Sequence, residues 1–434
     1  MNSSIERAPA AQRAQEPDVE SNLPRLAVVG DVSVEFTTGG ALILHRLLRG
    51  YPVDRLRVVE NPAFARGDPK LRLPDVHYEG VTYRVSRFVR NRFNPAWPVA
   101  MSLWIRRRTR IVLDVLRDFG PQAILTVPHG YLWFAAADAA RRLRIPLHLI
   151  IHDDWASLQT HNRAGRVYDA ARWGSRRVMG RVYRQASSRF CVSPGMNERY
   201  QEWFGARGSV LYPNRGEDSV TPRVRVRCAA PERPVAAFCG WIHQDGVANA
   251  LRQIGNSLHS IGGRLDLYGG LSPDRLEVFR LLPPAICSVG FLPMAEMVDR
   301  ISATAHALLL PSSFFAREQF DVATLFPSKL ADYTAMGIPI VVWGPRYSSA
   351  ARWAAENPGA AVLVTSPCVD DALAAIVKLA SNRSYAASIA AEGVRVGNSQ
   401  FDLRNARRML FDAISQTRGH PDAAGPEIRA RPRM

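Results

Sequence analysis

The residues best suited to chemistry lie in one stretch, 325–345, which reads LFPSKLADYTAMGIPIVVWGP. Its pattern predicts a turn at Pro327, a helix from Lys329 to about Met336 and a buried strand over 340–343. Only three of the 56 lysines and arginines in the chain are lysines. A lysine at a helix start in such an arginine-rich chain indicates that the position needs the compact charge of an ammonium group. Unpaired N–H groups give a helix N-terminus partial positive charge. We therefore predict that Ser328 caps this helix and that Lys329 and the helix start bind phosphate.

A second candidate site follows the apolar run 146–151, where His152 and Asp153 stand in sequence. The carboxyl ends of parallel strands are where ligands bind in open α/β sheets. On this interpretation His152 hydrogen-bonds a bound ligand and Asp153 orients it. The alternative is a strand-end histidine followed by a helix-capping aspartate. Asp153 and Asp154 are the nearest approach to a metal-binding acid pair, and we predict no metal site.

These side chains need elements that position them, and the chain supplies a repeated pattern of buried strand, loop and helix. The first unit is a strand at 25–30, a loop at 31–38, the pair Gly39–Gly40 and a helix to about residue 48. It lacks the GxGxxG fingerprint of dinucleotide binding. Similar strands are predicted at 123–127, 146–151, 235–239, 264–268 and 307–310. This alternation predicts an α/β protein with parallel sheets.

The composition is that of a globular protein of two ordinary domains, with 434 residues and a net charge of +17. There is no apolar run of the ~18 residues that span a membrane and no secretion signal. Five scattered cysteines without CxxC spacing indicate free thiols, so we expect a cytoplasmic protein. The basic charge suits nucleic acid, an anionic membrane surface or phosphorylated small molecules.

A basic and aromatic window covers 84–110, with eight arginines and no acidic residue. A helix is predicted at 101–115, carrying Trp104, Arg106, Arg107 and Arg108. A second basic helix is predicted at 165–187. Arginine with interleaved aromatics indicates a surface that contacts a membrane or a polyanion, and a membrane contact would make the protein peripheral at the inner face of the plasma membrane. The alternative is a solvated face. Nucleic acid is the weaker candidate, because no binding-motif spacing appears.

The stretch 325–345 resembles the donor-binding segment of GT-B glycosyltransferases, in particular the retaining family-four (group 1) type with its variant PSKLxEYxAxGxPVV. The resemblance implies that Pro327, Ser328 and Lys329 face the diphosphate of a nucleotide sugar and that Asp332 binds the ribose. It further implies that Gly40 and Gly240 line the cleft and that the backbone at Gly290 and Phe291 reads the base. Residues 191–214, CVSPGMNERY…VLYPN, follow the family pattern vSxxMxexy…vxpNg.

The chain departs from this family pattern at two places. Family members often carry an arginine and a lysine just after the glycine at position 240; here His243 or Lys329 must serve instead. The family also commonly shows two glutamates eight residues apart, whereas here the second is Asp332 and the first is Thr324. Glu318, in the preceding loop, is the candidate to replace it.

The resemblance implies two Rossmann-like domains facing a cleft, with a C-terminal helix that crosses back to the first domain. We expect disordered tails at 1–22 and 420–434, a first, acceptor-side domain at 23–215, a linker at 216–234, a nucleotide-sugar-binding domain at 235–397 and the crossing helix at 398–419. The polar, Pro- and Arg-rich composition of the linker supports that boundary.

The expected activity is metal-independent transfer of a sugar, without a cofactor, from a nucleotide-diphosphate sugar to a glycan, lipid-linked or otherwise anchored acceptor. Bacterial polysaccharide or cell-envelope biosynthesis is the expected setting. Two alternatives stay open: a nucleotide-sugar 2-epimerase of the same fold, and a non-catalytic basic protein that binds membrane or nucleic acid.

Overall fold

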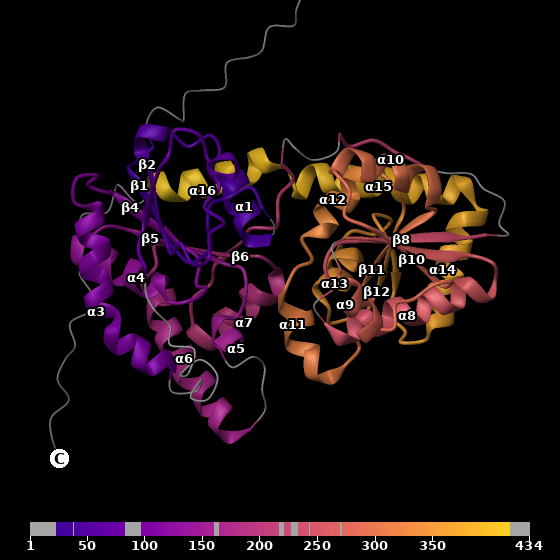
Figure 1. Cartoon of the computed structure of the whole chain (residues 1–434), viewed down its shortest axis with the longest axis horizontal. Coiled ribbons are helices and arrows are strands. Elements are labelled where there is room, and N and C mark those ends of the chain that lie inside the picture. Colours follow the sequence, from indigo (N-terminus) through magenta and orange to yellow (C-terminus); the bar gives the residue numbers. More distant parts are fainter. Residues whose placement is uncertain are drawn as a thin grey trace, which may run out of the picture.

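The computed structural model describes residues 23–37, 39–82, 97–159, 165–216, 221–226, 233–242, 244–269 and 271–416. Two parallel sheets organise these residues into two α/β halves (Figure 1). No helix in these ranges is both long enough and apolar enough to cross a membrane. The basic window at 84–96 and His243 lie outside the described residues.

The first sheet has seven parallel strands in the order β3-β2-β1-β4-β5-β6-β7. The central strands are buried apolar runs, as expected where helices cover both faces. The strands are β1 (Leu26–Gly30), β2 (Leu56–Glu60), β3 (His77–Gly80), β4 (Ala123–Thr126), β5 (Leu147–Ile151), β6 (Ser188–Cys191) and β7 (Ser209–Val210). The helices are α1 (Gly39–Leu48), α3 (Trp97–Leu116), α4 (Leu132–Leu143), α5 (Trp155–Gln159), α6 (Arg166–Gln185) and α7 (Pro194–Phe204), with 3-10 turns η2 (Val53–Arg55) and η3 (Pro69–Leu71).

The second sheet has six parallel strands in the order β10-β9-β8-β11-β12-β13. They are β8 (Val235–Cys239), β9 (Arg264–Tyr268), β10 (Ile286–Gly290), β11 (Ala307–Pro311), β12 (Ile340–Trp343) and β13 (Val362–Val364). The helices are α8 (Asp245–Ser260), α9 (Pro273–Val278), α10 (Met294–Thr304), α11 (Gln319–Thr324), α12 (Lys329–Met336), α13 (Ser349–Glu356), α14 (Val369–Ser381) and α15 (Arg383–Gln400), with the 3-10 turn η5 (Ala316–Glu318).

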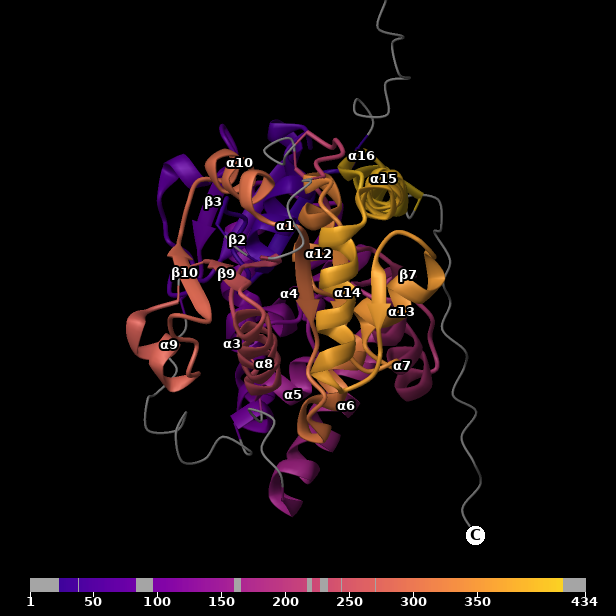
Figure 2. The same ribbon diagram turned by 90° about the vertical axis from the view of Figure 1, so that its right-hand side faces the viewer.

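Side-chain alternation along each strand divides the core of the second half into two layers. Ala236 and Phe238 of β8 pack into the layer of α8 and α14, whereas Ala237 and Cys239 pack into the layer of α10 and α12. Figure 2 shows α8 and α14 beside this sheet. The period of two that places neighbouring residues on opposite faces thus fixes which helix each strand residue supports.

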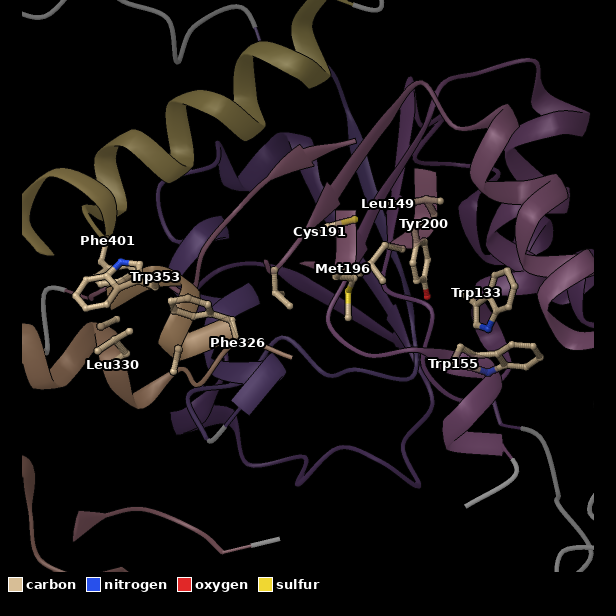
Figure 3. Packing of buried hydrophobic residues seen from close by; sticks show 14 of the residues in the cluster. Trp133, Leu149, Trp155, Cys191, Met196, Tyr200, Phe326, Leu330, Trp353 and Phe401 are labelled. Atoms are coloured by element: carbon tan, nitrogen blue, oxygen red, sulfur yellow. The ribbon is translucent and has the colours of Figure 1, made fainter. Parts of the chain in front are cut away.

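The two sheets present their carboxyl edges to each other. The Ser193 hydroxyl, just after β6, donates to the Thr324 carbonyl, which lies between β11 and α12. Nearby, Arg352 makes a bidentate ion pair with Glu198, with both N–O distances 2.7 Å. One buried cluster continues across this junction, from Trp133 and Trp155 to Phe326, Trp353 and Phe401 (Figure 3). The ends of strands from both halves therefore lie on either side of one interdomain region.

The last helix, α16 (Leu403–Gln416), returns to the first half, as predicted (Figure 1). Leu410, Phe411 and Ile414 are buried in the same cluster as Leu26 and Val28 of β1. The Arg407 guanidinium donates to the Arg46 carbonyl of α1. The C-terminal helix thus completes the core of the first domain.

Candidate functional site

Helix α12 is fixed against the central strand β8 by the hydroxyl of Tyr333. This buried hydroxyl accepts a hydrogen bond of 2.7 Å from the Cys239 N–H at the end of β8. Lys329 lies one turn earlier on the same face, since residues four apart share a helix face. Its ammonium lies 3.8 Å from the Phe238 ring centre, and a Cβ on Gly240 would come within 3.5 Å of the Lys329 nitrogen. The predicted lysine and Gly240 therefore meet at the carboxyl end of β8.

This end of β8 is the switch point of the second sheet, because β8 lies between β9 and β11 and the chain reverses its direction of crossing there. Burial lowers the pKa of Lys329 to about 8. Burial also raises the pKa of the Cys239 thiol to about 12, and the charges of Lys329 and Asp332 both act on that thiol. Asp332 is half-buried beside this strand end. The end of β8 thus lies beside a cation, Lys329, which can bind a phosphate, and a carboxylate, Asp332, which can accept from a hydroxyl.

The prediction that Ser328 caps α12 is wrong. Ser328 has helical dihedral angles and makes no side-chain capping bond. The chain already turns at Pro327, whose carbonyl accepts from the Leu330 N–H at 2.9 Å, so the Ser328 hydroxyl is not in a cap position. Gly337 ends the helix in the left-handed conformation, with φ of +62°. The exposed Ser328 side chain therefore does not cap the first turn of α12.

Backbone bonds connect the ends of β8, β9 and β10. The Gly240 N–H donates to the Tyr268 carbonyl at 2.7 Å, and the Gly269 N–H donates to the Gly290 carbonyl at 2.9 Å. Gly290 has φ of +85°, and the ring of Phe291 beside it is 81% exposed. Gly240, Gly290 and Phe291 therefore lie along one sheet edge. An exposed aromatic ring there is available to a flat ligand.

Glu318 reaches the N-terminus of α8. Its carboxylate accepts from the Gly246 N–H at 3.3 Å and lies 3.7 Å from the Arg317 guanidinium. Arg317 also pairs with Asp245 at 2.6 Å. A Cβ on Gly246 would lie 2.8 Å from the Glu318 oxygen, so the glycine admits the carboxylate. Glu318 thus lies at the first βα loop of the second half, even though its sequence position differs from that of the family's first glutamate.

In the first half, Gly40 and His152 are in direct contact. A Cβ on Gly40 would lie 2.5 Å from Nδ1 of His152, so only glycine admits the ring. Burial, with a smaller contribution from the nearby His129, lowers the pKa of His152 to about 4. Nε2 of His152 is buried and has no hydrogen-bond partner among the described residues. His152, packed against Gly40, therefore places a neutral, polar imidazole at the end of β5.

His129 and Asp31 join this position, although neither was among the predicted site residues. His129 follows β4 as His152 follows β5, so the same strand-end signal was present for both. The buried Asp31 carboxylate, just after β1, accepts from the Tyr131 and Leu132 N–H groups at 2.5 and 2.8 Å. Its role is to fix the start of α4, because a carboxylate at a helix N-terminus is stabilising.

The neighbouring acids Asp153 and Asp154 have different environments. Asp153 is half-buried next to His152. Asp154 is buried and accepts from Ser157, Tyr200 and Arg176. The helix-capping role therefore belongs to Asp154, which holds α5, and Asp153 stays the candidate for substrate. Among the described residues no group of three His, Cys, Asp or Glu side chains could hold a metal ion.

The basic helices agree only partly with the predicted surface. α3 spans Trp97–Leu116, but the side chains of Trp104 and Arg106 lie outside the described residues. Arg107 is exposed, whereas Arg108 is 8% exposed and acts electrostatically on Tyr131. The prediction that Arg108 belongs to an open basic surface is wrong, because its position on α3 faces the fold. On α6 one exposed face carries Arg166, Trp173, Arg177, Arg181 and Arg184.

Residues 38–216 match the sequence profile of the glycosyl transferase 4-like domain. The fold matches HepE of Anabaena in complex with UDP and glucose, with a TM-score of 0.62, 15% identity, and 91% of this chain and 100% of that chain covered. Sucrose-phosphate synthase from Thermosynechococcus elongatus matches with a TM-score of 0.62 and 13% identity, over 90% of this chain and 98% of that chain.

A third similar structure is WaaG, a glycosyltransferase involved in lipopolysaccharide biosynthesis. It matches with a TM-score of 0.58 and 13% identity, over 90% of this chain and 99% of that chain. No curated protein sequence matches the chain. The comparisons confirm the GT-B fold and the two Rossmann-like halves predicted from the sequence.

Proposed function

We propose that this GT-B chain, with a glycosyl transferase 4-like domain in its first half, transfers a sugar from a nucleotide-diphosphate sugar to an acceptor. The observation that carries the proposal is the Lys329 ammonium at the carboxyl end of β8, next to the first turn of α12. A lysine and a helix N-terminus stabilise a phosphate by charge and by N–H donation. The crystal structures of HepE in complex with UDP-glucose and with UDP support a nucleotide sugar as donor.

The chemistry assigned to the second half is stabilisation of the leaving nucleoside diphosphate. Negative charge grows on the diphosphate as the glycosidic bond breaks, and a preorganised cation lowers the free energy of that transition state. Lys329 supplies the charge, Asp332 accepts from ribose hydroxyls, and the Gly290–Phe291 edge contacts the base. Gly240 leaves room for the phosphates to approach the backbone.

The chemistry assigned to the first half is orientation of the transferred sugar and the acceptor. His152 is neutral at pH 7, so it offers a hydrogen bond without charge. Asp153 orients the acceptor if the sugar keeps its anomeric configuration, and acts as general base if the configuration inverts. NMR of the product anomer distinguishes these outcomes.

The acceptor we propose is a glycan or a lipid-linked or otherwise anchored molecule, in bacterial polysaccharide or cell-envelope biosynthesis. The basic face of α6 supports an anchored acceptor, because cationic and aromatic side chains together favour an anionic membrane surface. Arg177 lies over the exposed ring of Trp173, 4.3 Å from its centre. The similarity of the fold to WaaG, a glycosyltransferase involved in lipopolysaccharide biosynthesis, supports a cell-envelope setting.

The proposal is tested by a thermal-shift screen with UDP-, GDP-, ADP- and dTDP-sugars, followed by an assay for the released nucleoside diphosphate. A ligand that binds only the folded state must raise the melting temperature. We expect one nucleotide family to stabilise the protein and its sugar to appear on an acceptor. Free epimerised sugar without acceptor would identify the epimerase alternative, and stabilisation by none of the nucleotides would contradict the proposal.

We further predict that transfer does not need a divalent cation, because Lys329 and the α12 N-terminus offset the leaving-group charge. Activity is measured after dialysis against EDTA, with and without added Mg²⁺ or Mn²⁺. Full activity in EDTA is the expected result. Loss of activity that either cation restores would contradict this prediction.

A further inference from the structure

Arg215 lies where the chain passes between the two domains. The chain crosses between the domains after β7 and crosses back after α15. The Arg215 N–H donates to the Phe401 carbonyl at 2.9 Å, which joins these two crossings. Arg215 is only 7% exposed.

The Arg215 guanidinium binds the helix that carries Lys329. Nε donates to the Ala331 carbonyl at 3.0 Å, and Nη2 donates to the Thr334 hydroxyl at 2.6 Å, both on α12. Nη1 donates to the Asn398 side chain of α15 at 2.6 Å. All three nitrogens therefore have acceptors, two on the helix and one at the second crossing.

The space for this guanidinium depends on Gly397. A Cβ at this position would lie 1.9 Å from Nη2 of Arg215 and 2.3 Å from the Thr334 hydroxyl. Real Cβ atoms do not approach other heavy atoms this closely, so glycine is required here while the arginine is in place. The absence of a side chain at Gly397, beside the second crossing, thus leaves the space that Arg215 of the first crossing occupies.

The same junction is bonded to the first domain. Arg46 of α1 donates to the Asn214 carbonyl at 2.9 Å, and Arg407 of α16 donates to the Arg46 carbonyl at 2.8 Å. α1 begins with the Gly39–Gly40 pair, and Gly40 contacts His152. A continuous series of arginine-to-carbonyl bonds therefore leads from α16 and α1 to residues 214–215, and Arg215 continues it to α12.

We propose that Arg215 is a positioning residue that couples the interdomain crossings to α12 and so sets the place of Lys329 and Asp332 relative to the first domain. The inference rests on the proposed nucleotide-sugar site. Each nitrogen of the buried guanidinium has an acceptor, and movement away from these acceptors would leave an unpaired charge inside the protein, which is strongly unfavourable. α12 must therefore move together with the crossings when the domains change their relative orientation.

Arg215 stays charged at neutral pH. Burial lowers its pKa to about 10, while the carboxylates of Asp332 and Asp402 favour the charged form. Lysine at this position keeps the charge but cannot supply three donors in one plane. Arg215→Lys thus keeps the positive charge but removes the planar set of three hydrogen-bond donors. Gly397→Ala keeps the guanidinium and displaces it from its acceptors.

Arg225 offers a matched control at the other end of the same helix. It donates to the Met336 carbonyl at 2.9 Å, and its N–H donates to the Gly337 carbonyl at 2.7 Å. Its side-chain hydrogen bonds to the described residues go to residues 221, 223, 335 and 336, and so reach neither α15 nor the residue 214–215 junction. Arg225→Lys therefore weakens the end of α12 without uncoupling it from the crossings.

The first measurement is amide hydrogen exchange on the full chain without ligand, which needs no assumption about the substrate. We expect faster exchange both in the 329–334 segment and in the 397–401 segment for Arg215→Lys and Gly397→Ala. Arg225→Lys should alter only the end of α12 and residues near 337. Unchanged exchange in either segment in both junction variants overturns the inference, because coupling requires both to respond.

The second measurement is calorimetric titration with UDP, GDP, ADP and dTDP. We expect Arg215→Lys and Gly397→Ala to bind the preferred nucleotide at least about tenfold more weakly than the wild type, and Arg225→Lys to bind it within about twofold. Equal binding by all four proteins overturns the positioning role. If the wild type binds no nucleotide the proposed function fails, and hydrogen exchange alone still decides whether Arg215 couples the crossings to α12.

Discussion

At the scale of single residues, the position of His152 depends on the absence of a side chain at Gly40. The imidazole occupies the space that a Cβ would fill, 2.5 Å from Nδ1. Because burial lowers the pKa of His152 to about 4, the ring is neutral from about pH 5 upward. Its contribution to transfer is therefore positional, and titration of His152 does not shape a pH profile between pH 6 and 8.

We predict that His152→Ala and Gly40→Ala both lower kcat by at least about tenfold and change nucleotide affinity much less. The reason is that the His152 imidazole acts mainly in the transition state. Gly40→Ala acts through displacement of the ring. Steady-state kinetics and calorimetry separate the two effects. Gly174→Ala, where a helical Cβ meets nothing within 4 Å, is the control that should retain kcat. Full kcat in either site variant would make His152 structural.

The sequence places Lys329 at the start of a helix and His152 at the end of a strand, and the structure has both residues in these positions. His129 follows a strand as well and carried the same signal. Ser328 and Arg108 were misjudged, because the turn at Pro327 and the inward face of α3 depend on three-dimensional packing. Arg215 had no local signal, since its acceptors Ala331, Thr334 and Asn398 are more than 100 residues away in the chain.

At the scale of elements, the helix α6 separates a buried face from a basic one. Met179 and Tyr183 are buried, whereas Trp173, Arg177 and Arg181 are exposed. A solvated helix face does not need a large exposed indole, but an interfacial helix uses one at the headgroup level. This face extends the predicted basic surface of the first domain, of which residues 84–96 lie outside the described part of the chain.

We predict that Arg177→Glu/Arg181→Glu reduces binding to vesicles containing anionic lipid, because each lysine or arginine near such a surface contributes about 1 kcal/mol. Co-sedimentation with phosphatidylglycerol and phosphatidylcholine vesicles at two salt concentrations measures it. Arg383→Glu/Arg408→Glu makes the same change in charge at exposed positions away from α6. Equal binding by both double variants, or no preference of the wild type for anionic vesicles, would contradict this account.

Long apolar elements were predicted well from the sequence, and short or polar strands were not. The limits of β8, α12 and β12 agree with the pattern. The edge strand β3 reads HYEG and has no buried residue, and β13 has three residues. Such strands exist because a neighbouring strand supplies hydrogen bonds, so their own sequence carries little evidence of them.

At the scale of the whole molecule, the first domain is incomplete without the end of the chain. Phe411 of α16 is buried against Tyr51, with ring centres 5.3 Å apart in a T-shaped arrangement. The alternation of strands and helices predicted two parallel sheets. It could not predict contacts such as Ser193 with Thr324 or Glu198 with Arg352, which join residues far apart in the sequence.

We predict that Phe411→Ala lowers the free energy of unfolding by about 3–5 kcal/mol, as expected for removal of a buried aromatic side chain. Hydrogen exchange in β1 and α1 should rise, because these elements share its core cluster. Met409→Ala on the same helix is the control, since Met409 is 38% exposed. A loss below about 1 kcal/mol by chemical denaturation would show that α16 does not complete the first domain.

The central claim is that Lys329 binds the diphosphate of the donor, and calorimetric titration of the preferred nucleoside diphosphate tests it most directly. Lys329→Ala should lose about 1.5–3 kcal/mol of binding free energy, the contribution of a hydrogen bond to a charged group. Because burial lowers the pKa of Lys329 to about 8, the free wild type loses this charge as the pH rises from 7 to 9, so its affinity should fall. Lys329→Ala should lack that fall, and Lys378→Ala should behave as the wild type. Unchanged affinity in Lys329→Ala at pH 7 would contradict the account.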